Sequence, residues 1–118
     1  MKNFAAYTNA LELIRALVPI LEQFRARSAD LAKQLEQAAS SIVQNVAEGA
    51  RRHGRDPRRF YSMANGSANE VRSLLDLAEA WGWAIDDRSA RALLDRELGL
   101  LWGLTRDRET RSATRRAS

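Results

Sequence analysis

Apolar residues recur every three or four positions along four segments of the chain, the spacing that gives a helix one buried face. These segments run from about residues 4 to 25, 28 to 51, 57 to 81 and 86 to 106, with short polar stretches between them. Each is long enough to span roughly 30 Å at 1.5 Å per residue. Because short connections place successive helices side by side, the pattern predicts an all-α, antiparallel up-down four-helix bundle.

Local signals indicate where the helices begin and end. Ser28 or Asp30 is a suitable N-cap for the second helix. Asp56 followed by Pro57 is the clearest start signal in the chain, because a proline at the first helical position lacks an N–H that would be unpaired there anyway. Gly82 is a suitable stop for the third helix.

The first and last helices each carry two apolar stripes, so their apolar arcs are wider than one contact within a bundle requires. The wide arc has two interpretations, a broad face buried within one chain or a subunit interface in a homo-oligomer. Pro19 lies inside the first helix and is expected to kink or interrupt it. In the first helix we take one stripe as the buried face, Phe4, Tyr7, Leu11, Ile14, Val18 and Leu21, and a second stripe lies beside it, Ala10, Leu13, Leu17, Ile20 and Phe24. In the last helix one stripe is Leu94, Leu98 and Leu101, and the other is Leu93, Leu100 and Leu104.

Positive charge is concentrated in two segments. Residues 51–59 carry five arginines against one acid and residues 106–118 carry five against two, so they contribute +4 and +3 to a total of +4, and the remainder sums to −3. The helix dipole favours cations at the end of the second helix but disfavours them at the start of the third. The first segment therefore indicates binding to phosphates or to a carboxylate-rich partner, against the simpler interpretation of a solvated helix connection. The residues predicted to bind nucleic acid are Arg51, Arg52, Arg55, Arg58 and Arg59.

Length and composition restrict the class of protein. A chain of 118 residues fits one domain, and the absence of cysteine excludes disulfides and thiolate metal sites. Residues 1–106 are expected to form the bundle, and residues 107–118, which lack apolar periodicity, a flexible basic tail. No stretch approaches roughly 18 uninterrupted apolar residues, so we expect a cytoplasmic protein without membrane contact.

Polar residues on the second helix are expected to face a polar stretch of the third. We interpret them as a hydrogen-bond network that fixes helix register, rather than as a catalytic carboxylate pair or a di-metal site. The only histidine, His53, does not follow a glutamate by three residues, as bundle metal sites require, and no phosphate-binding glycine loop occurs. The chain is therefore expected to be a non-enzyme with no catalytic residue, metal or cofactor. The predicted network consists of Ser41, Asn45, Glu48, Ser67 and Glu70.

The run SSIVQNVAEGARR, with MANGSANEV further along, resembles the four-helix-bundle family of 23S rRNA-intervening-sequence proteins, which includes the accessory variability proteins of diversity-generating retroelements. The family pattern is Ser-Ile-x-x-Asn-Ile-Ala-Glu-Gly on the second helix with an arginine shortly after, then Gly-Ser and Glu on the third. The usual glycine before that arginine is replaced here by Arg51. The matching residues are Ser41, Ile42, Asn45, Val46, Ala47, Glu48, Gly49 and Arg52, then Gly66, Ser67 and Glu70.

The resemblance implies a bundle without known enzymatic activity. Because the retroelement members form pentameric barrels with a basic surface and bind nucleic acid and a reverse transcriptase, we expect a homo-oligomer, with a pentamer as the first expectation. DNA or RNA and a reverse transcriptase are the expected partners. Members encoded in rRNA intervening sequences have no settled role, so the alternative is an oligomeric protein-interaction scaffold with no nucleic-acid function.

Overall fold

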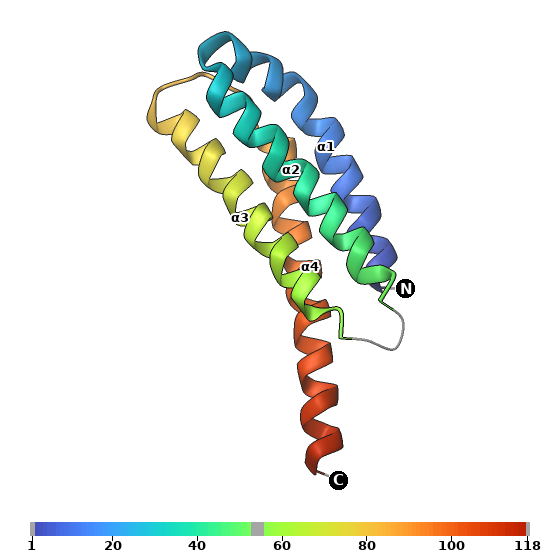
Figure 1. Cartoon of the computed structure of the whole chain (residues 1–118). Coiled ribbons are helices and arrows are strands. Elements are labelled where there is room, and N and C mark those ends of the chain that lie inside the picture. The colour runs from blue at the N-terminus through green and yellow to red at the C-terminus, as the bar shows by residue number, and fades with distance from the viewer. Residues whose placement is uncertain (1, 53–55, 118) are drawn as a thin grey trace.

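The chain folds into four helices that lie alongside one another. The computed structural model describes the backbone of residues 2–52 and 56–117, and the side chains of residues 4–52 and 56–106. The helices are α1 (Lys2–Arg27), α2 (Ala29–Ala50), α3 (Arg58–Ala80) and α4 (Arg88–Ala117), and the described residues contain no strand. Helices α2 and α4 each pack against both α1 and α3. Figure 1 shows the resulting elongated bundle, with α4 continuing past the ends of the other three helices. The predicted all-α class with four helices is confirmed.

The buried face of α1 is the second of the two stripes found in the sequence. The five residues of this stripe, Ala10, Leu13, Leu17, Ile20 and Phe24, are each at most 2% exposed. In the other stripe Phe4 is 64% exposed and Val18 is 51% exposed. The prediction that the Phe4 stripe is buried is therefore wrong for the single chain. Both stripes have the same helical spacing, so periodicity could not choose between them, and the positions of α2 and α4 make the choice. An apolar strip on the outside of α1 is left uncovered.

Pro19 does not interrupt α1, contrary to the expectation from the sequence. The helix is continuous from Lys2 to Arg27 with Pro19 inside it. Proline removes one backbone hydrogen bond, but Pro19 is on the exposed side and the flanking Leu17 and Ile20 are buried. Core packing on both sides of the proline therefore keeps the helix intact.

One described helix, over Phe4–Arg27, is long and apolar enough to cross a membrane by length and composition. A core helix of a bundle passes the same test. Leu13, Leu17 and Ile20 account for much of this apolar character, and all three are buried against the other helices.

The predicted cap of α2 and the predicted stop of α3 are both present. The Ser28 hydroxyl accepts a hydrogen bond from the Leu31 N–H at 3.2 Å and caps α2. Gly82 has φ +80°, its N–H donates to the Glu79 carbonyl at 2.9 Å, and the N–H of Trp83 donates to the Ala78 carbonyl at 3.0 Å. This pair of bonds is a Schellman motif, which requires the left-handed backbone that glycine adopts without strain.

Helix α4 is longer than the sequence pattern predicted. The apolar periodicity ends near Arg106, but the helix continues to Ala117. Residues 104–117 contain no glycine or proline and are rich in arginine, which favours helix without a buried face. Apolar periodicity reports burial rather than helicity, so it stopped where the bundle contacts stop.

Candidate nucleic-acid interface

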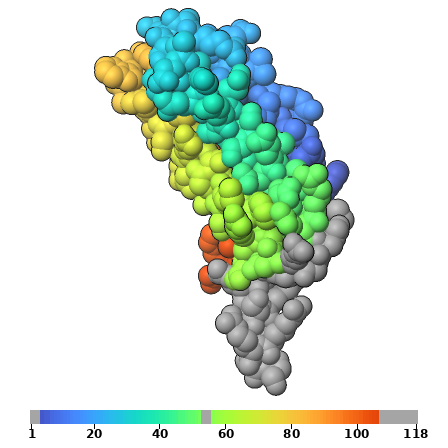
Figure 2. Space-filling view, in the orientation of Figure 1, coloured from blue at the N-terminus to red at the C-terminus, as the bar shows by residue number. Residues whose placement is uncertain are grey.

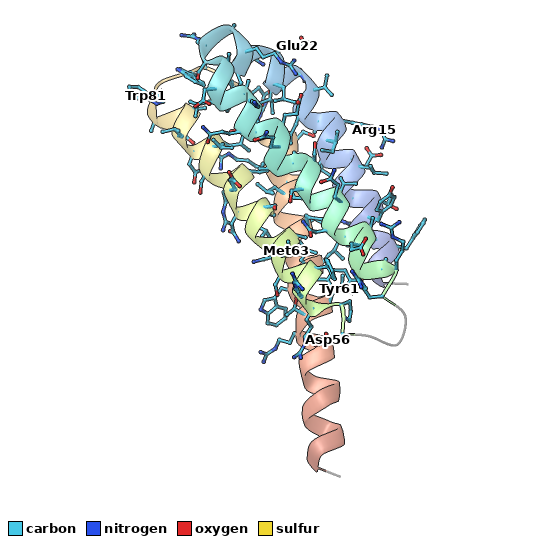
Figure 3. The ribbon with its side chains drawn as sticks, in the orientation of Figure 1. Arg15, Glu22, Asp56, Tyr61, Met63 and Trp81 are labelled. Carbon is cyan, nitrogen blue, oxygen red and sulfur yellow. The ribbon has the colours of Figure 1, made fainter. Side chains whose placement is uncertain are left out.

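Two arginine-rich parts of the chain meet at one end of the bundle. Figure 1 shows the connection between α2 and α3 at the end from which α4 projects. Figure 2 shows the end of α2, the start of α3 and the described part of α4 together on this part of the surface. In Figure 3, Asp56, Tyr61 and Met63 lie at this end and Trp81 at the other. We call this region the basic end, and its described arginines are Arg51, Arg52, Arg58, Arg59 and Arg106.

Close packing of α2 on α3 holds the basic end in place. Tyr61 is 4% exposed, and a Cβ atom added to Gly49 would lie only 2.6 Å from Cε1 of the Tyr61 ring. No side chain larger than hydrogen fits at position 49 without displacing this ring. The glycine therefore lets the first turn of α3 pack directly against the last turn of α2.

The two arginines at the end of α2 share one carboxylate. Glu48 Oε2 accepts from Arg51 Nη2 at 2.8 Å, and Glu48 Oε1 lies 2.9 Å from Arg52 Nη2. Arg51 is 74% exposed, whereas Arg52 is 33% exposed and its Nε is buried without a hydrogen-bond partner among the described residues. The sequence places Glu48 on one helical face with Arg52, an expected partner of its carboxylate, and the structure adds Arg51 as a second partner.

Asp56 both caps α3 and binds an arginine. Its Oδ1 accepts from the Arg58 N–H at 3.0 Å, and its Oδ2 lies 2.6 Å from Arg58 Nη2. The structure assigns the helix start to Arg58 after Pro57, one residue beyond the predicted boundary, but the capping bond of Asp56 is present. Arg58 is therefore compatible with the start of a helix because Asp56 compensates its charge.

Among the described arginines of residues 51–59, Arg59 makes no ion pair with a described carboxylate. It is exposed, and its guanidinium carbon lies 5.8 Å from the centroid of the Phe60 ring. The guanidinium carbon of Arg52 lies closer to the same ring, at 4.6 Å. Both distances are within the range of a cation–π interaction. In the sequence, Phe60 begins the apolar stripe of the third helix that continues with Ala64. In the structure Tyr61 takes the buried position, and the Phe60 ring is half-buried beside the two guanidinium groups.

The net charge of the described basic end is smaller than the sequence suggested. Two carboxylates balance part of the charge of the four described arginines of residues 51–59. One is Asp56, and the other is Glu48, which precedes that segment in the sequence. Arg55 was also predicted to bind nucleic acid and lies outside the described residues. On α4, Arg106 adds a further exposed cation, with its guanidinium carbon 5.0 Å from the ring centroid of Trp102.

The predicted polar network forms in part. Ser67 Oγ donates to Ser41 Oγ at 2.9 Å across α2 and α3, and Asn45 Nδ2 donates to the Ser41 carbonyl at 2.9 Å and to its hydroxyl at 3.0 Å. Glu48 pairs with arginines instead, and Glu70 is exposed without a hydrogen bond or ion pair to a described residue. Within the described part of the chain, no three histidine, aspartate or glutamate side chains gather as a metal site would require.

Sequence reasoning missed a buried carboxylate between α1 and α4. Glu97 is fully buried, its Oε1 accepts from Asn9 Nδ2 at 2.9 Å, and its Oε2 has no partner among the described residues. Burial raises the pKa of Glu97 to about 7, against the opposing effects of the Asn9 hydrogen bond and the Arg96 charge. Its position in the sequence could have indicated burial, because Glu97 lies three residues after Leu94 and four before Leu101, on the same helical face as these two leucines.

The fold and the basic end define a small helical-bundle protein whose cations gather where α2, α3 and α4 meet. The chain belongs to the family of 23S rRNA-intervening sequence proteins, whose family model matches residues 2–96. The match covers most of the bundle and ends within α4, before its arginine-rich C-terminal part. No curated protein matches the chain.

Proposed function

We propose that this protein is a non-enzymatic, nucleic-acid-binding helical bundle that binds phosphate backbones through its basic end. The observation that carries the proposal is that Arg51, Arg52, Arg58 and Arg59 lie at the end of the bundle from which the arginine-rich C-terminal part of α4 projects. The remainder of the chain sums to −3. The positive charge is therefore directional, and a polyanion approaching from this end meets both segments together.

The arrangement supports contacts with phosphates rather than with base edges in a duplex groove. Arg51 and Arg52 are held by Glu48 and Arg58 by Asp56, which fixes their positions but reduces their charge. Arg59 is exposed and carries no such ion pair with a described acid. Binding through guanidinium–phosphate contacts is sequence-tolerant and weakens as salt rises, because it releases condensed counterions.

A homo-oligomer would multiply this affinity, and we propose a pentamer of antiparallel up-down bundles as its first form. The uncovered strip of α1 supports self-association, because Phe4, Tyr7 and Val18 are 64%, 37% and 51% exposed. An apolar groove of about 250 Å³ lies along the same side of α1, where Val18 and Leu21 approach Ala39 of α2. Several basic ends in one particle would bind a long polyanion by avidity. We place this assembly in the cytoplasm and, by analogy with the retroelement members, propose a reverse transcriptase as its protein partner.

The proposal is tested by removing the cations of the connection together. Replacing Arg55, Arg58 and Arg59 by alanine should weaken binding of a labelled oligonucleotide at low salt by at least about tenfold while helix content is unchanged. Replacing Arg25, Arg27 and Arg88 by alanine is the matched control, because it removes the same three charges from exposed positions at the other end of the bundle. Equal affinity of the triple variant and the wild type would exclude the connection as the binding surface.

The alternative is a protein-interaction scaffold with no nucleic-acid function. The pairing of Arg51, Arg52 and Arg58 with two carboxylates favours it, because these carboxylates cancel two of the three positive charges. Under this alternative the wild-type protein forms a defined oligomer but does not bind DNA or RNA at low salt. The same titration therefore separates the two functions.

A further inference from the structure

Phe60 occupies an unusual position for a phenylalanine in the first turn of a core helix. The next residue, Tyr61, is buried against Gly49 and fixes this turn. Phe60 is absent from the buried core and from the partly buried apolar residues that pack against it. The ring is half-buried at the surface of the basic end, where Arg52 and Arg59 are its cationic neighbours. Core packing does not explain an aromatic side chain here.

The two arginines are held at the ring to different degrees. Arg52 is anchored, with its guanidinium carbon 4.6 Å from the ring centroid and its Nη2 2.9 Å from Glu48 Oε1. Arg59 is exposed and stands 5.8 Å from the centroid, close to the limit of about 6 Å for a cation–π contact. A planar group could displace Arg59 from the ring at little cost, and the released guanidinium would remain available for a phosphate.

We propose that Phe60, with Arg52 and Arg59 beside it, is a stacking platform for a nucleobase of single-stranded nucleic acid. An aromatic ring set among arginines is the combination with which proteins bind single strands, because every base has a π-face and the strand carries a phosphate at each step. A base within a duplex is already stacked on both faces and cannot reach the ring. This inference rests on the proposed nucleic-acid binding and adds that the preferred ligand is an unpaired strand.

The test compares wild type and Phe60→Leu in binding a labelled oligothymidylate and a DNA duplex of the same length. Leucine retains apolar volume but has no π-face, so affinity for the single strand should fall by about fivefold to a hundredfold while duplex affinity is unchanged. Phe60→Tyr should retain single-strand affinity. Trp81→Leu, which removes a 68% exposed aromatic side chain at the other end of the bundle, should have no effect. Circular dichroism and thermal unfolding establish that each variant is folded.

The outcomes separate this inference from the function on which it rests. Loss of single-strand affinity alone supports the stacking platform. If the wild type binds both ligands and Phe60→Leu changes neither, the platform is excluded while phosphate binding stands. An equal loss for both ligands also excludes stacking, because it assigns the effect of Phe60 to arginine placement. If the wild type binds neither ligand, the proposed function fails and this inference fails with it.

Discussion

Asn9 and Glu97 form a polar pair inside the bundle, with Asn9 Nδ2 donating to Glu97 Oε1 at 2.9 Å. The same amide nitrogen donates to the Leu93 carbonyl at 2.9 Å, so Asn9 joins α1 to α4 through two bonds. Glu97 Oε2 has no partner among the described residues. Since an unpaired buried charge is costly, the fold favours the protonated form of Glu97.

This pair predicts that stability falls as pH rises through the neutral range. The pKa of Glu97 is raised by burial from its ordinary value of 4.5 to about 7 in the folded chain. Its contribution is therefore fully present below pH 4.5 and is lost as pH rises to about 7. The free energy of unfolding should fall by up to about 3 kcal/mol across this window, as measured by urea unfolding at several pH values. Glu97→Gln cannot ionise and should lack this decline; the same pH dependence in both proteins would contradict the assignment.

Gly49 and Gly66 form a matched pair for testing the packing of α2 on α3. Gly49→Ala places a methyl group 2.6 Å from Cε1 of the buried Tyr61 ring and should lower the free energy of unfolding by about 1–3 kcal/mol. Gly66→Ala meets nothing within 4 Å and should raise it by up to about 1 kcal/mol, through helix propensity. Equal effects of the two substitutions in urea unfolding would show that the close approach at Gly49 is not required.

Glu48 neutralises two arginines of the basic end, so its removal should strengthen nucleic-acid binding. Glu48→Gln keeps the shape of the side chain but frees the charges of Arg51 and Arg52, whose Nη2 atoms lie 2.8 Å and 2.9 Å from the carboxylate. Affinity for an oligonucleotide at low salt should rise by about two- to fivefold, the value of a partly exposed charge pair. Glu36→Gln, which breaks the exposed Arg25–Glu36 pair on another part of the surface, removes the same charge as a control. An equal rise with both variants would indicate net charge rather than position.

The uncovered strip of α1 predicts where self-association can be broken. Val18→Glu puts a charge on a 51% exposed apolar side chain and should reduce the particle mass measured by light scattering without loss of helix. Leu77→Glu makes the same change at a 38% exposed position of α3 and should leave the mass unchanged. A wild-type protein that is monomeric at all concentrations would overturn the oligomer itself.

Sequence signals predicted well where α2 and α3 begin and where α3 ends. They did not predict which of two adjacent apolar residues is buried. Ser28, Asp56 and Gly82 were identified because caps and stops depend on a few adjacent residues. The sequence pattern did not decide between Phe60 and Tyr61 for the core. Adjacent residues on a helix differ by about 100°, and the structure buries Tyr61, whose ring lies against Gly49.

The sequence predicted which arginines belong to the candidate site, but not how far nearby carboxylates reduce their charge. The spacing of Glu48 and Arg52 made Arg52 an expected partner of the Glu48 carboxylate, but it gave no indication that Arg51 would share the same carboxylate. The pattern also ended the last helix near Arg106, whereas α4 continues to Ala117, so the helical projection of its arginine-rich part from this end was not predicted. Buried Glu97 was missed because a carboxylate inside an apolar row contradicts the pattern used to find the row.

The salt dependence of nucleic-acid binding tests the central claim most directly. A labelled oligothymidylate would be titrated with the wild-type protein at several potassium chloride concentrations, and the logarithm of the binding constant plotted against that of the salt concentration. We predict binding at low salt with a slope steeper than about −2, as expected when at least three phosphates are neutralised. No binding at low salt, or an affinity independent of salt, would contradict phosphate recognition by the basic end.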